Sequence, residues 1–209
     1  MKKILLIGGG GHCHSVLDSL LSLHLYEVIG VVDRNKHICI EGATVVGQDN
    51  ELPQLFDEGW KEAFVTVGSV GDTSLRRRLF CMAKTIGFSF PVIVDPTASL
   101  AQNVKIMPGT YVGKKAVVNS NCYIGMCSII NTGAIIEHDC KIGEFSHVSP
   151  GAILCGEVEV GRDSHIGAGA IIRQQIQIGS ESVIGMGSSV VRNIPDRVLA
   201  YGNPCKVVK

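Results

Sequence analysis

Three consecutive residues, Glu137-His138-Asp139, form the group in this sequence best suited to proton transfer. An imidazole can take up a proton near neutral pH, and a neighbouring carboxylate can fix its tautomer and raise its basicity. The three residues interrupt a run of aliphatic and small residues, NTGAIIEHDCKIGEFSHVSPG (131–151), where outward acids have no packing role. Whether they do chemistry depends on where the surrounding elements place His138.

The elements that position His138 follow a period of six residues. Every sixth residue from Val94 to Val190 is Val, Ile or Leu, over seventeen positions without a break, and the residue four further on is mostly small. This period is neither helical nor simply alternating, and it is typical of a parallel β-helix in which each hexapeptide forms one side of a triangular coil. Three sides make a coil of eighteen residues, so the register predicts a little over five coils and no long loop leaving them.

Residues eighteen positions apart should stack on adjacent coils, about 4.8 Å apart. By this rule His147 lies beneath His165, and His138 lies at an outward corner beneath Gly156, which has no side chain. Period and composition alone still favour a simpler alternative, a solvated corner histidine whose acidic neighbours only aid solubility. Cys140 falls at the small inward position, so we expect buried filler there and not a nucleophile.

Residues 1–93 follow a different pattern, in which apolar strands alternate with helical segments. Such alternation predicts a small Rossmann-like parallel sheet with helices on its faces. The expected strands are 2–9, 26–33 and 62–68, the expected helices are 14–24 and 71–87, and 89–95 is a fourth strand or a linker. The predicted organisation is therefore an α/β domain over 1–93, a β-helix over 94–193 and a C-terminal tail over 194–209.

The glycine run IGGGGHCHS (7–15) follows the first strand and opens the first helix. Backbone N–H groups in such a loop can approach a phosphate closely, and the helix dipole favours its negative charge. A dinucleotide fingerprint fails here, because counting from Gly8 and Gly10 its third glycine would fall at Cys13. The domain is also too short for the two-half dinucleotide fold. We interpret the loop as a site for the diphosphate of a sugar nucleotide.

Composition argues against several classes of function. The 209 residues carry no net charge, whereas nonspecific nucleic-acid binding needs a basic surface. No apolar run approaches eighteen residues, so we expect no membrane span. The eight cysteines form no C-x-x-C pair and follow no zinc spacing, which predicts reduced thiols in a cytoplasmic protein and no metal site.

Larger motifs resemble a known family. The repeat [VIL]-[GNE]-x-x-[SAC]-x, the segment NTGAIIEHDCKIGEFSHVSPGAILCG (131–156) and the closing GNPCKVV (202–208) resemble the left-handed β-helix acyltransferases. More narrowly, the whole chain resembles the branch with an N-terminal nucleotide-binding domain. That branch includes N-acetyltransferases of UDP- or GDP-linked 4-amino sugars and the sialic acid O-acetyltransferases. The resemblance implies left-handed coils, a homotrimer, and acetyl-CoA in the groove between neighbouring helices.

The resemblance also implies roles for individual residues. His138 would be the general base, and Asp139, where the family usually carries the longer Glu, would tune it. Acetyl-CoA would contact His147, the N–H of Gly156 and Ala168, and the acceptor would lie near Asn131. The residues expected near the sugar nucleotide are Gly10, Gly11, His12, Asp33, Arg34 and Gly68.

These features lead to one main hypothesis, acetyl-CoA-dependent acetylation of the amino group of a nucleotide-linked amino sugar in surface glycan synthesis. One histidine base would serve an amine or a hydroxyl, so O-acetylation of a sialic acid remains open. A non-catalytic sugar-nucleotide-binding scaffold also remains open, although an outward His138–Asp139 pair argues against it. A nucleotidyltransferase is disfavoured, because the N-terminal domain is short and lacks a clear nucleotidyl-transfer loop.

Overall fold

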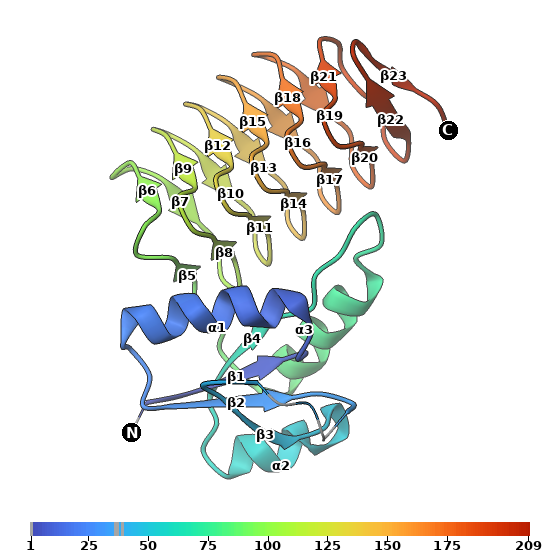
Figure 1. Cartoon of the computed structure of the whole chain (residues 1–209). Coiled ribbons are helices and arrows are strands. Elements are labelled where there is room, and N and C mark those ends of the chain that lie inside the picture. Colours follow the sequence, from blue (N-terminus) through green and yellow to red (C-terminus); the bar gives the residue numbers. More distant parts are fainter. Residues whose placement is uncertain (1, 36–37, 39) are drawn as a thin grey trace. The chain divides into compact units, whose positions relative to one another are not determined.

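The computed structural model describes residues 2–35, 38 and 40–209 (Figure 1), so one of the eight cysteines, Cys39, lies outside the described residues. The chain divides into two compact units. The first contains residues up to Ser69 together with Ser74–Ile93, and the second contains Val70–Thr73 together with Val94–Lys209. In the described part of the chain, no helix has both the length and the apolar character needed to cross a membrane.

The first unit is built on a parallel sheet of four strands in the order β3-β2-β1-β4. Apart from Lys3, the residues of the two central strands are apolar or glycine, as expected for parallel strands that are covered on both faces. The strands are β1 (Lys3–Ile7), β2 (Val28–Val32), β3 (Thr44–Gly47) and β4 (Glu62–Val65). The helices are α1 (Gly11–Leu23), α2 (Leu52–Asp57) and α3 (Ser74–Ile86), with a short 3-10 helix, η1 (Asp49–Glu51), before α2.

The sequence prediction for this unit was incomplete. Strand β3 and helix α2 were not expected, because a half-buried edge strand of four residues and a helix of six carry little periodic signal. Helix α1 begins at Gly11, three residues earlier than expected, so part of the glycine run is helical. In the segment 89–95, Ser89 forms a single parallel bridge with Glu62, whereas the strand that follows belongs to a sheet of the β-helix.

The second unit is a parallel β-helix with three faces, each named here after one of its strands. The β13 face contains β7 (Lys105–Ile106), β10 (Tyr123–Ile124), β13 (Lys141–Ile142), β16 (Glu159–Val160) and β19 (Gln177–Ile178). The β12 face contains β6 (Ser99–Leu100), β9 (Val117–Val118), β12 (Ile135–Ile136), β15 (Ile153–Leu154), β18 (Ile171–Ile172) and β21 (Ser189–Val190). The β14 face contains β5 (Ile93–Val94), β8 (Tyr111–Val112), β11 (Ile129–Ile130), β14 (His147–Val148), β17 (His165–Ile166), β20 (Val183–Ile184), β22 (Leu199–Gly202) and β23 (Cys205–Val207).

The eighteen-residue register is confirmed along the β-helix. Ile135 pairs with Ile153 and His147 pairs with His165, each across one coil. The sixth-position aliphatic residues from Val112 to Val190 are nearly inaccessible and form one continuous core, whereas the first three, Val94, Leu100 and Ile106, are only partly buried. The inward serines donate their hydroxyl hydrogens to backbone carbonyls, as Ser146 does to Gly161 at 2.8 Å, so the small polar positions are satisfied inside the coil.

The C-terminal residues 194–209 add further structure to the β-helix. Strand β22 pairs in parallel with β20 and antiparallel with β23, and Ala200 is fully buried in the core. Ile194 is also buried and forms a bridge with Ile178. Much of the segment that we expected to be a tail therefore continues the fold, because its apolar residues remain in position to cover the last coil.

Candidate active site at a corner of the β-helix

His138 lies at the corner between the β12 face and the β13 face, in the turn that joins β12 to β13. Its side chain is 56% exposed, so the imidazole is on the outer surface, as the period predicts. Adjacent coils form backbone hydrogen bonds around this turn, for example from the N–H of Glu157 to the carbonyl of His138 at 2.9 Å. The backbone that carries the ring is therefore held in place by hydrogen bonds between coils.

Asp139 forms the contact that was expected to tune His138. Its Oδ2 lies 2.8 Å from Nδ1 of the imidazole, even though Asp is one methylene shorter than the family's usual Glu. Asp139 has φ +62°, a left-handed conformation that brings the carboxylate beside the preceding ring. The hydrogen bond to Asp139 raises the pKa of His138, and the nearby carboxylates of Glu137 and Glu157 contribute in the same direction.

The same contact determines which ring nitrogen can act as a base. Hydrogen bonds from His138 and then from Asn121 lower the pKa of Asp139, so its carboxylate is ionised at neutral pH and can only accept. Nδ1 must therefore carry the hydrogen in this contact, and Nε2 of the neutral ring has the free lone pair. A base at Nε2 with an orienting acid at Nδ1 is the arrangement used for general base catalysis.

Gly156 lies directly against this imidazole, as the register predicts. A Cβ built on Gly156 would be 2.6 Å from both Cε1 and Nε2 of His138, which no side chain could occupy without displacing the ring. The carbonyl of Gly156 accepts from the N–H of Gln175 at 2.9 Å. Its own N–H meets no acceptor among the described residues, so a hydrogen-bond donor is available close to the basic nitrogen.

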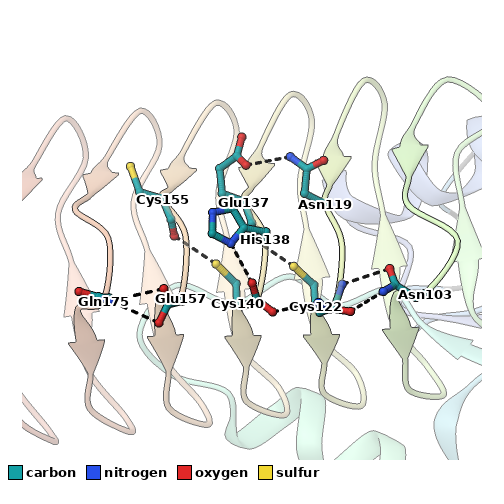
Figure 2. Close-up of polar contacts among 11 residues, drawn as sticks. Asn103, Asn119, Cys122, Glu137, His138, Cys140, Cys155, Glu157 and Gln175 are labelled. Carbon is teal, nitrogen blue, oxygen red and sulfur yellow. Dashed lines mark hydrogen bonds and ion pairs between the residues drawn. The ribbon is translucent and has the colours of Figure 1, made fainter.

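The remaining polar groups of the corner are held by neighbouring coils (Figure 2). Glu137 Oε2 accepts from Asn119 Nδ2 at 3.0 Å. The thiol of Cys140 is fully buried and donates to the carbonyl of Cys155 at 3.2 Å, and hydrogen bonding with the Cys122 thiol together with burial raises its pKa. The expectation that Cys140 is buried filler is confirmed, since a buried thiol of high pKa is a poor nucleophile.

Asn131, His147 and Ala168 lie elsewhere on the same β-helix. The ring of His147, on the outer side of the β14 face, packs edge-to-face against that of His165, with centroids 5.0 Å apart, and its Nε2 is 3.1 Å from Nδ2 of Asn131. Ala168 is exposed at the corner between β17 and β18. Within one chain the structure therefore brings His138, Asp139 and Gly156 together and pairs Asn131 with His147, but it places these two groups at different edges of the β12 face.

A surface groove follows the β13 face, beginning next to the His138 corner. It has a volume of about 770 Å³, and its lining includes Tyr123, Lys141 and Ile178. Lys141 is two residues beyond Asp139 and its Nζ lies 2.7 Å from Oε1 of Glu159. The sequence pattern does not reveal this groove, because its lining residues occupy ordinary positions of the repeat.

The glycine loop of the first unit lies at the carboxyl end of its parallel sheet, where ligands of open α/β folds bind. Gly8 has φ +108°, and the N–H of Gly9 donates to Oδ2 of Asp33 at 2.7 Å. The hydroxyl of Thr66, at the end of β4, donates to the carbonyl of Gly8 at 2.5 Å. The loop is therefore tied to the ends of β2 and β4 as well as to β1.

Most of the residues expected near a sugar nucleotide lie at this edge. Gly10 is the N-cap of α1, and Gly11 begins the helix. A small cavity of about 140 Å³ is lined by Asp33 and Arg34, and also by Asp49, for which the sequence carries no motif. Gly68 is exposed, and a Cβ there would lie 3.6 Å from that of half-buried His12. The described residues include no group of three or more His, Cys, Asp or Glu that could hold a metal ion.

Comparison with known proteins places this arrangement in a family. Residues 3–83 match the model of the PglD N-terminal domain, and residues 157–192 match the hexapeptide repeat of succinyl-transferase. A search of curated protein sequences found no match.

Two solved structures are similar over essentially the whole chain. A variant of perosamine N-acetyltransferase from Caulobacter crescentus, solved with CoA and GDP-perosamine, is 35% identical over 100% of this chain and 98% of its own, with a TM-score of 0.95. The acetyltransferase domain of PglB from Neisseria gonorrhoeae, solved with acetyl coenzyme A, is 35% identical over 99% of both chains, with a TM-score of 0.93. The chain therefore belongs to the family of hexapeptide-repeat sugar acetyltransferases that carry a PglD N-terminal domain.

Proposed function

We propose that this protein transfers the acetyl group of acetyl-CoA to the amino group of a nucleotide-linked amino sugar. The observation that carries the proposal is the geometry at the corner, where the exposed ring of His138 has its Nε2 beside Gly156 and its Nδ1 hydrogen-bonded to Asp139. The relatives support it, because one was solved with CoA and a GDP-linked sugar and another with acetyl coenzyme A.

In the proposed reaction the sugar amine attacks the thioester carbonyl carbon directly. Nε2 of His138 takes the proton that the amine loses, a contribution of about 10²–10⁴ in rate. The N–H of Gly156 donates to the oxygen that becomes negative, and one such donor is worth about 3 kcal/mol. When the tetrahedral intermediate collapses, the C–S bond breaks and the proton passes from His138 to the leaving sulfur. No covalent acyl-enzyme forms.

The separation of the His147–Asn131 pair from His138 supports a homotrimer. His147 and Asn131 are at a different edge of the β12 face from His138, so they can border the same acetyl group only if they come from a neighbouring copy. In this arrangement acetyl-CoA lies between two copies, with its thioester at the His138 corner of one and near His147 and Ala168 of the other. The groove along the β13 face offers a path for the rest of the molecule.

The sugar nucleotide is assigned to the glycine loop. Helix α1 begins at Gly11, and its N-cap residue, Gly10, has no side chain, so a phosphate can approach the positive end of the helix dipole. Both carboxylate oxygens of Asp33 already accept hydrogen bonds, from Gly9 at 2.7 Å and Asn35 at 2.8 Å, so Asp33 shapes the loop while exposed Arg34 is free to face the nucleotide. We place the reaction in the cytoplasm, where acetyl-CoA and sugar nucleotides are both present, and in surface glycan synthesis.

The test is thiol release from acetyl-CoA in the presence of UDP- and GDP-linked 4-amino sugars, with free sialic acids as a comparison. We expect turnover with at least one amino sugar, and loss of about 10²–10⁴ in kcat for His138→Asn. The matched control is His24→Asn, which replaces an exposed histidine at the end of α1 where asparagine tolerates the left-handed φ of 52°. Light scattering should give a trimer for all three proteins. Turnover only with sialic acids, or near-normal turnover by His138→Asn, would contradict the proposal.

A further inference from the structure

We propose that Asn121 is a positioning residue of the acetyl-transfer site, which holds the Asp139 carboxylate so that it can keep the His138 ring in place. The inference rests on the proposed function, because it assigns a role within the same reaction. Asn121 lies seventeen residues before His138, on the adjacent coil, and it is not part of the Glu-His-Asp motif.

Asn121 belongs to a column of polar residues along the corner between the β12 and β13 faces. The column takes one residue from each coil, eighteen positions apart, and consists of Asn103, Asn121, Asp139, Glu157 and Gln175. The last four have φ between 61° and 62°. Their backbones therefore have the same geometry, and each side chain can reach its neighbour on the next coil. Figure 2 shows two separate sets of dashed contacts in this column, one beginning at Asn103 and the other joining Glu157 to Gln175.

Hydrogen bonds below Asn121 determine the orientation of its amide. Asn103 Nδ2 donates to Oδ1 of Asn121, and the backbone N–H of Asn121 donates to Oδ1 of Asn103 at 3.1 Å. With its oxygen directed at Asn103, the amide presents its nitrogen to the other side. Nδ2 of Asn121 donates to Oδ1 of Asp139 at 3.1 Å.

The two oxygens of Asp139 thus have separate donors. Oδ1 accepts from Asn121, and Oδ2 accepts from Nδ1–H of His138 at 2.8 Å. A carboxylate with both oxygens engaged cannot rotate about its last bond without losing one of the contacts. Hydrogen bonds therefore connect Asn103, Asn121, Asp139 and His138 in order. The last of them is at Nδ1 of His138, across the ring from Nε2, the proposed base.

The Asp139 carboxylate needs a donor that fixes its orientation, because it is exposed and has an acidic neighbour. The side chain of Asp139 is 47% exposed, and the next residue of the column is another acid, Glu157. The Glu157 carboxylate is turned toward Gln175, whose Nε2 lies 3.4 Å from both of its oxygens. Like charges on adjacent coils repel, so Asp139 is disfavoured on the Glu157 side. Asn121 supplies a neutral donor on the opposite side.

The variant Asn121→Gly removes the donor and leaves the left-handed backbone unstrained, since glycine adopts positive φ freely. We expect kcat to fall about threefold to tenfold, in line with loss of one charge-assisted hydrogen bond at a solvent-exposed site, while KM for acetyl-CoA and for the sugar nucleotide changes less than about twofold. Lys115→Gly is the matched control, because Lys115 is also exposed with φ 54° but lies at another corner. Its kcat and melting temperature should match the wild type.

A double-mutant cycle separates positioning from a general structural effect. If Asn121 acts through Asp139, adding Asn121→Gly to Asp139→Gly should cost less than about twofold in kcat, because the group it positions is already absent. A full multiplicative loss in that background would overturn the proposal. A rise in KM of Asn121→Gly without a fall in kcat would also overturn it. So would a loss of activity in Asn121→Gly that is accompanied by a clear fall in its melting temperature.

A second measurement does not depend on turnover. The ring signals of His138 can be followed by NMR against pH, and identified by their absence from His138→Asn. The charged groups facing this ring are Asp139, Glu137 and Glu157. Asn121→Gly should lower the pKa of His138 toward its ordinary value, and should not change it in the Asp139→Gly background. An unchanged pKa in Asn121→Gly would refute the positioning role, whereas a shift without any acetyl transfer by the wild type would refute only the proposed function.

Discussion

Replacing Gly156 by alanine adds one methyl group at the point where the His138 imidazole lies against the backbone. The new Cβ would lie 2.6 Å from Cε1 and Nε2 and 3.3 Å from Cδ2 of the ring. Carbon atoms in contact are comfortable at about 3.5–4.0 Å, so the ring must move by about 1 Å. The neighbouring Glu157 N–H remains bonded to the carbonyl of His138, which means that the side chain and not the backbone has to yield.

A displacement of about 1 Å at the base should lower kcat by about 10²-fold, because proton transfer and attack need near-contact geometry. Gly156 is not in a left-handed conformation, so alanine adds no backbone strain and the melting temperature should be unchanged or slightly higher. Thiol release from acetyl-CoA at saturating sugar nucleotide measures kcat, and a crystal structure of the variant measures the ring position. The N–H of residue 156 is retained, so the change tests the ring and not the oxyanion donor.

Two outcomes would refute this reasoning. The first is wild-type kcat in Gly156→Ala, which would mean that the ring does not need its observed position. The second concerns the variant that carries both His138→Ala and Gly156→Ala. If the loss acts through the imidazole, the double variant should be no slower than His138→Ala alone. A further loss of the same size would assign the effect to obstruction of the thioester.

Two more predictions follow from the same structure. Because the hydrogen bond that His138 donates to Asp139 raises the pKa of His138, the acid limb of kcat/KM should lie above the ordinary histidine value. Asp139→Asn should move that limb to lower pH while reducing the plateau, as a pH profile of thiol release would measure, and an unshifted limb would contradict the assignment of the base. Ile142 is fully buried in the β-helix core, so Ile142→Ala should lower the free energy of unfolding by about 2–5 kcal/mol in urea, whereas the matched Ile171→Ala, at a side chain 48% exposed, should cost less than about 1 kcal/mol.

The β-helix and its corner could be predicted from the sequence because they depend on a repeated and local rule. Each inward aliphatic residue is chosen by the same burial requirement, and the same step of eighteen that pairs His147 with His165 also brings Gly156 over His138. The outward direction of His138 follows from that register alone. The length of Asp139 did not prevent contact, because the left-handed turn supplies the reach that the missing methylene would have given.

Other features depend on interactions that have no periodic signature. Strand β3 and helix α2 are short and held by tertiary packing, so their local pattern is weak. The hydrogen bond from Gly9 to Asp33 joins the loops that follow β1 and β2, and a glycine pattern alone does not reveal it. The hydrogen bonds of Asn121 are different again, because the column can be read from the register but the amide orientation requires coordinates.

A β-helix without long insertions cannot close a loop over its substrate, so its catalytic groups must already be oriented before binding. At this corner the orientation comes from the coils on either side: the N–H of Glu157 holds the backbone of His138, Gly156 makes room for its ring, and Asn121 holds the acid that binds Nδ1. Each of these partners is eighteen or nineteen residues away from the residue it contacts. Substitutions one coil above or below His138 should therefore change kcat more than substitutions within the same turn that point away from the ring, and a kinetic scan of the corner column would test that order.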